Sequence, residues 1–121
     1  MMWILLVSAA ATLVALANIS LKHGLTQVTT SLPQASLNFH SIPYLASNLY
    51  IWLGMLGLVS GFACWLAGLS RIQLSNAYPV FVGVEYTLVI LLSWLILSEA
   101  FAPIKIAGIV IVFIGIMVIV R

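Results

Sequence analysis

A carboxylate, a proline and a glycine lie close together inside a long apolar stretch of this 121-residue chain. Glu85 is near the centre of residues 75–97, a run long enough to cross a bilayer at about 1.5 Å per residue. An ionisable side chain at that depth costs about 2.5 kcal/mol or more and is read by default as functional. Pro79 removes a backbone donor and Gly83 removes a side chain, so we expect a hinge at these two residues. A hinged membrane helix with a central acid indicates transport.

Tyr78 and Phe81 share one face of this predicted helix with Glu85, because the three residues are separated by three, four and seven positions. A face of this kind suits the wall of a substrate cavity. The other interpretation of Glu85 is structural: a protonated carboxyl group that hydrogen-bonds a neighbouring helix.

The first apolar segment carries small and polar residues at three- and four-residue spacing, which places them on one helix face: Ser8, Ala11, Ala15, Asn18 and Lys22. Such a face either packs against another helix or lines a cavity. Lys22, at the end of the segment, either extends to the membrane interface or holds a phosphate at headgroup depth.

The composition assigns the chain to the integral membrane proteins, since 64% of its residues are hydrophobic and only 5% are charged. Its four Lys and Arg residues are too sparse for a nucleic-acid surface. The sequence contains no nucleophile and base pair at a plausible depth, no phosphate-binding loop and no cluster of metal ligands. We therefore expect neither an enzyme nor a bound cofactor or metal.

Apolar runs predict a single all-α domain of four transmembrane helices, at residues 2–22, 45–69, 75–97 and 104–120, with a polar loop over residues 23–44. Four spans place both termini on one side of the membrane. That side would carry Arg71 and Arg121, and the other Lys22 and Lys105, so the positive-inside rule gives no orientation. Glu99 is expected to be a solvated residue of the last turn.

Two sets of glycines predict helix packing. Gly54, Gly57 and Gly61 form a small-residue stripe on the second span, which we expect to pack within the bundle. Gly108 and Gly115 lie seven residues apart on the last span, in a seam that suits helix pairing, including pairing between subunits.

Over essentially its whole length, and most clearly from about Gln73 to Val120, the chain resembles the small multidrug resistance proteins of the drug/metabolite transporter superfamily. The matching features are Ala77-Tyr78, Gly83-Val84, Leu92-Ser93-Trp94, and Glu99 before Pro103 and Gly108. The drug exporters of that family carry a glutamate eight residues before the lysine that ends their first helix, where this chain has Val14. The Ala77-Tyr78-Pro79 motif is more similar to another branch, the flippases of undecaprenyl-phosphate-linked monosaccharides, which include the aminoarabinose-phospho-undecaprenol flippase subunits.

This resemblance implies a dimer in the bacterial inner membrane that moves a polyprenyl-phosphate-linked monosaccharide between leaflets by alternating access. The partner would be an antiparallel second copy or a paralogue. Lys22 would hold the phosphate, with Arg71 from the other side. Asn18, Tyr78 and Glu85 would hydrogen-bond the sugar.

Two alternatives remain open at this point. The first is a proton-coupled exporter of small hydrophobic cations or metabolites, in which Glu85 replaces the acid missing from the first helix and aromatic rings surround it. The second is a non-transporting assembly subunit, which would use the glycine stripes and leave Glu85 without a role.

Overall fold

A computed structural model describes residues 1–32, 38–100 and 102–121. Four helices are long and apolar enough to cross a membrane: α1 (Met2–Ser31), α3 (Leu49–Leu69), α4 (Leu74–Leu97) and α5 (Pro103–Val120). A 3-10 turn, η1 (Phe39–Ser41), and the short helix α2 (Ile42–Ser47) precede α3. The described residues form no strand. The predicted four-helix membrane fold is therefore confirmed.

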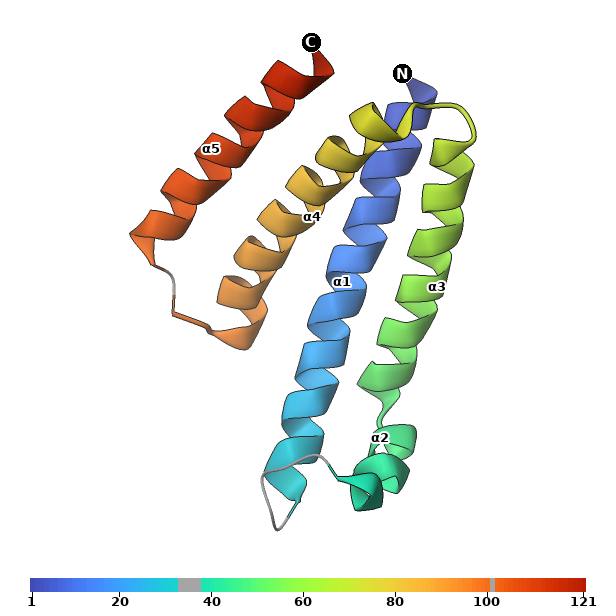
Figure 1. The fold of residues 1–121 in the computed structure, drawn as a ribbon. Helices are drawn as coiled ribbons and strands as arrows, with labels where there is room; N and C mark the ends of the chain where they lie inside the picture. Colours follow the sequence, from blue (N-terminus) through green and yellow to red (C-terminus); the bar gives the residue numbers. More distant parts are fainter. Residues whose placement is uncertain (33–37, 101) are drawn as a thin grey trace.

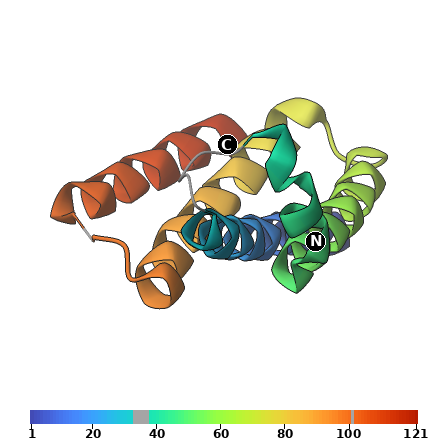
Figure 2. The ribbon, with the colours of Figure 1, turned by 90° about the horizontal axis from the view of Figure 1, so that it is seen from below.

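The four long helices stand nearly in single file in the order α5, α4, α1, α3, as Figures 1 and 2 show from the side and from below. α1 packs against α3 on one side and α4 on the other, and α5 packs on α4. The buried apolar residues concentrate on α1, whereas α5 contains no buried residue. The outer faces therefore present apolar side chains that suit lipid rather than water.

Glycines allow α1 and α3 to approach closely. A Cβ atom on Gly57 would lie 2.9 Å from the Ala17 Cβ, and one on Gly61 would lie 3.3 Å from the Ala10 carbonyl oxygen. Gly54 packs on α1 in the same way. A bulkier residue at these positions would push the two backbones apart.

The glycines of α4 and α5 differ in their surroundings. Gly83 lies against the Ile116 side chain of α5. Gly108 and Gly115 face open space, where an added Cβ would meet no neighbouring atom within 4 Å. Their role in helix pairing stays a prediction.

The first helix is longer than the sequence indicated. Residues 23–31, assigned to the polar loop 23–44, continue α1 as regular helix. Gly24 is buried against α3, where an added Cβ would lie 2.8 Å from the Ile51 Cγ1. Packing against α3 therefore stabilises as helix a polar segment for which helix propensity alone predicted a loop. Residues 33–37 of the predicted loop lie outside the described residues.

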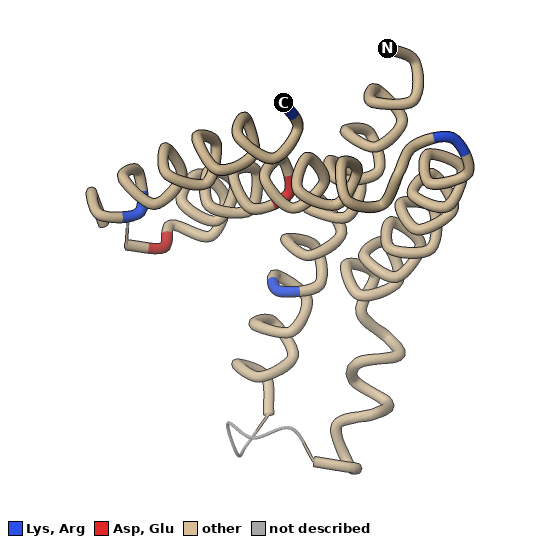
Figure 3. The backbone as a smooth tube through the Cα atoms, turned by 45° about the horizontal axis from the view of Figure 1, so that its top comes forward, with Lys and Arg blue, Asp and Glu red and all other residues tan. Residues whose placement is uncertain are grey.

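Most of the charged residues lie near helix ends, whereas one cation lies partway along the first helix (Figure 3). Both termini lie at the end that carries Arg71 and Arg121. Lys22 and Lys105 lie toward the opposite end. Because Lys22 lies within α1, nine residues before its end at Ser31, the equal division of cations between the two ends stays a prediction.

Candidate functional site

A hydrogen bond joins α1 and α4 within their membrane-spanning segments. The Asn18 Nδ2 donates to the Glu85 Oε1 over 3.0 Å, and both side chains are half-buried. In lipid, a polar pair of this kind satisfies two groups that would otherwise lack partners. The structure thus brings together two residues that the sequence predicted as substrate ligands, which come from positions 67 residues apart.

One helical turn beyond Asn18, about 6 Å along α1, Lys22 makes an ion pair. Its Nζ donates to the Glu99 Oε1 in the turn between α4 and α5. This contact corrects the expectation that Glu99 is a freely solvated turn residue. The ion pair is partly exposed, since 56% of the Lys22 side chain and 36% of the Glu99 side chain are accessible to solvent.

The end of α4 directs Glu99 toward α1. Ser98 has a φ of 53°, a left-handed conformation that ends the helix, and the Glu99 backbone N–H donates to the Ser93 carbonyl over 3.3 Å. The hydrogen bond from Lys22 lowers the pKa of the Glu99 carboxyl group below its usual value, and the charges of Lys22 and Lys105 add to this effect. Glu99 is therefore an anion that is paired with Lys22 and is also stabilised by the charge of Lys105.

A groove of about 560 Å³ runs along α1 at the same end of the molecule. It is lined by Asn18, Leu21, Lys22, Leu25, Thr26 and Thr29. The sequence reasoning missed Thr26 and Thr29 because it ended the helix at residue 22. The signal was present, since the spacing of Asn18 and Lys22 continues at three- and four-residue intervals through both threonines. The Thr26 and Thr29 hydroxyl groups donate to carbonyl groups of their own helix, so Lys22 is the lining residue that suits an anionic ligand.

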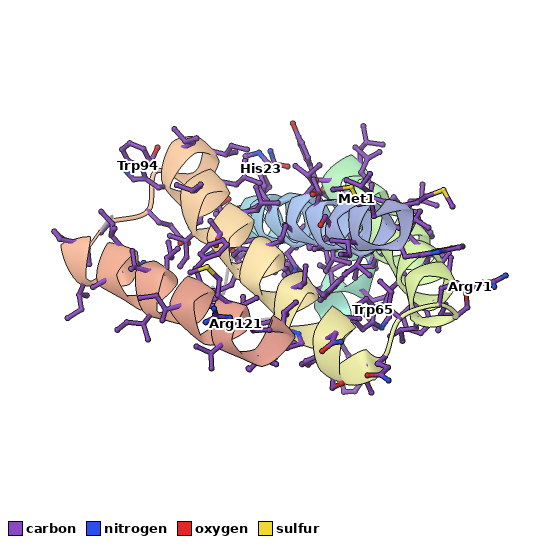
Figure 4. All side chains as sticks on the ribbon, turned by 90° about the horizontal axis from the view of Figure 1, so that it is seen from above. Met1, His23, Trp65, Arg71, Trp94 and Arg121 are labelled. Atoms are coloured by element: carbon purple, nitrogen blue, oxygen red, sulfur yellow. The ribbon has the colours of Figure 1, made fainter. Side chains whose placement is uncertain are left out.

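Tyr78 and Phe81 line a different cavity, between α4 and α3. The Trp65 ring of α3 lies 4.6 Å from the Phe81 ring and 6.1 Å from the Tyr78 ring, measured between centroids. Figure 4 shows Trp65 among the side chains of the bundle. The cavity measures about 530 Å³ and also contacts Val14, one turn before Asn18 on α1. Its aromatic and aliphatic walls suit an apolar ligand.

Arg71 is not brought to the same place as Lys22. Its guanidinium carbon lies 5.5 Å from the centre of the Trp3 ring, at the end of the bundle where the termini lie. Pro79 and Gly83 sit within a continuous α4, so the hinge stays a prediction. Within the described ranges no three His, Cys, Asp or Glu side chains are placed to hold a metal ion.

Four membrane-crossing helices with a polar pair between two of them are typical of a multi-pass membrane transporter. Residues 35–121 match the EamA-like transporter family. The chain therefore belongs to this family, which confirms the resemblance to the drug/metabolite transporter superfamily. No solved structure matches the chain.

Several curated relatives carry names that describe lipid-linked sugar transport. A protein of Erwinia tasmaniensis named "Probable 4-amino-4-deoxy-L-arabinose-phosphoundecaprenol flippase subunit ArnF" is 33% identical over 98% of this chain and 94% of its own length. The ArnF subunit of Proteus mirabilis is 31% identical over 92% of this chain and 86% of its own length. An ArnE subunit of Pseudomonas paraeruginosa is 32% identical, but the alignment spans 54% of this chain and only 56% of that relative. These relatives are named as flippase subunits, not as enzymes.

Proposed function

We propose that this protein is a flippase subunit that moves a polyprenyl-phosphate-linked monosaccharide between membrane leaflets. The observation that carries the proposal is the similarity to the ArnF subunit of Erwinia tasmaniensis, which extends over 98% of the chain. The groove on α1 that contains Lys22 supports it, because a flippase must shelter a phosphate and a sugar while the lipid tail stays in hydrocarbon.

The residues of α1 and α4 have complementary roles in this proposal. Lys22 binds the phosphate as a point charge at the edge of the membrane. Asn18 and Glu85 lie one turn deeper and exchange their mutual hydrogen bond for bonds to the sugar hydroxyl groups. The groove is open along its length, so the polyprenyl tail can leave sideways into lipid.

A partner subunit is part of the proposal. The groove that contains Lys22 is lined by α1 alone and needs a second wall to enclose a headgroup. The outer face of α5, with Gly108 and Gly115 facing open space, offers a surface for a second copy or a paralogue. Two such subunits in the bacterial inner membrane would rock around a central substrate, as in other transporters built from repeated halves.

The phosphate role of Lys22 can be tested by binding. Full-length protein in nanodiscs would be titrated with undecaprenyl-phosphate aminoarabinose, and binding would be followed by native mass spectrometry. Lys22→Ala should weaken binding about ten- to hundredfold, the usual effect of removing a charged hydrogen-bond partner. Arg121→Ala is the matched control, because it removes a cation at the C-terminus of the chain that does not line the groove. Equal affinity of wild type and Lys22→Ala would reject the phosphate role.

One observation favours a second function, proton-coupled export of small hydrophobic cations or metabolites. The aromatic cavity of Trp65, Tyr78 and Phe81 ends one helical turn from Glu85. A hydrophobic cation could place its rings there and its charge against the carboxylate. In this case cations and not lipid-linked sugars would bind, and Glu85→Gln would abolish binding.

A further inference from the structure

Lys22, the residue proposed to bind phosphate, already has an anionic partner in this structure. Its Nζ is hydrogen-bonded to the carboxylate of Glu99. A substrate phosphate approaching Lys22 must therefore compete with a carboxylate of the same chain. The proposal above does not account for this competition.

We propose that Glu99 is a built-in counterion that occupies the phosphate site while it is empty and leaves when the substrate phosphate arrives. This inference rests on the proposed flippase function. The exchange replaces one anion with another, because a lipid-linked sugar phosphate is a phosphodiester with one negative charge. Lys22 is thus paired in both states, which avoids a bare cation at the edge of the hydrocarbon.

The surroundings of Glu99 provide a place for the displaced carboxylate. Lys105, in the first turn of α5, already acts electrostatically on Glu99 and has no ion-pair partner among the described residues. A rotation of the Glu99 side chain away from α1 would exchange Lys22 for Lys105. Both partners are partly or fully exposed to solvent, so the change requires no opening of a packed core.

The exchange would also change how the helices are connected. Lys22 belongs to α1, whereas Glu99 belongs to the turn that joins α4 and α5, so their ion pair ties α1 to that turn. Substrate phosphate on Lys22 would release the turn from α1. Glu99 is thus a positioning residue that links occupancy of the headgroup site to the freedom of α4 and α5.

The test is a binding titration of undecaprenyl-phosphate aminoarabinose into full-length protein in phosphatidylcholine nanodiscs, which contain no competing anionic lipid. Glu99→Gln should bind about two- to fivefold more tightly than wild type, the range expected for removing one exposed ion pair that competes. Lys105→Gln should bind more weakly than wild type, because Glu99 loses its alternative partner. In a Lys22→Gln background, Glu99→Gln should have no effect.

The outcomes separate this inference from the function on which it rests. If wild type binds the lipid-linked sugar and Glu99→Gln binds it equally or more weakly, Glu99 is a structural contact and the inference is wrong. The proposed function then stands. If neither protein binds the lipid-linked sugar, the flippase proposal fails and the inference fails with it. A gain that persists in the Lys22→Gln background would also overturn the inference, because it could not arise from competition at Lys22.

Discussion

The two sides of α1 are built from different interactions. Toward α3, glycines meet alanines and aliphatic side chains at close range along most of the helix. Toward α4 and its following turn, the specific polar contacts are the Asn18–Glu85 hydrogen bond and the Lys22–Glu99 ion pair. Close packing of small residues has one good arrangement, whereas polar contacts can be exchanged for bonds to a ligand. If the chain is a flippase subunit as proposed, we expect α1 and α3 to form its fixed part and α4 and α5 to form the part that responds to substrate.

The largest loss of stability is expected from disrupting the close packing between α1 and α3. In Gly57→Leu the new Cβ would lie 2.9 Å from the Ala17 Cβ, so the helix backbones must separate. We expect a loss of about 1–3 kcal/mol in the free energy of unfolding, the usual cost of overpacking. Unfolding by sodium dodecyl sulfate, followed by circular dichroism, measures it.

Gly108→Leu is the matched control, because the same change on α5 enters open space within the subunit. It should leave the stability of the monomer nearly unchanged. Equal destabilisation by both variants would contradict the assignment of α1 and α3 as the tightly packed pair.

A smaller effect is expected from the polar contact between α1 and α4. Asn18→Ala and Glu85→Ala should each destabilise the protein, and a double-mutant cycle should give a coupling energy of about 0.6 kcal/mol, with an upper limit of about 1.7 kcal/mol. Strictly additive effects in the same denaturant titration would show that the hydrogen bond contributes nothing to stability. The Gly57→Leu effect should exceed this coupling.

The sequence predicts the elements of this molecule better than it predicts their contacts. Hydropathy identifies the four spans because each must satisfy its own backbone inside lipid. Helical periodicity places Glu85 and Asn18 on the inner faces of their helices, but their pairing depends on how α4 is rotated against α1, which no local pattern records. The ion pair of the turn residue Glu99 was not predicted for the same reason, since its partner Lys22 is 77 positions away.

The end of α1 shows a second reason why the sequence alone did not predict the structure. Polar residues after Lys22 are typical of a loop, and the helix continues because tertiary contacts with α3 support it. The His23 ring meets the Tyr50 ring edge to face at 4.6 Å, and the Asn48 amide donates to the Gln27 side chain over 3.2 Å. The threonine hydroxyl groups bond back to carbonyl groups of their own helix, as Thr26 does to Lys22. These contacts override weak helix propensity, which a single segment does not reveal.

The smallest effect on stability is expected from the ion pair between Lys22 and Glu99, and this effect depends on pH. The pKa of Glu99 is lowered mainly by the hydrogen bond from Lys22, so the folded protein holds the charged carboxylate more strongly than the unfolded chain does. The contribution of the pair to stability is fully present above the unfolded pKa of glutamate, about 4.3, and is lost as the pH falls through the lowered value in the folded state. The difference in melting temperature between wild type and Glu99→Gln should therefore be constant from neutral pH down to about pH 5 and should disappear in stronger acid.

Because both side chains are exposed to solvent, the difference should also shrink at high salt. A difference that survives strong acid and high salt would mean that Glu99 stabilises the turn through its shape and not its charge, and the α4 side of α1 would then resemble the α3 side.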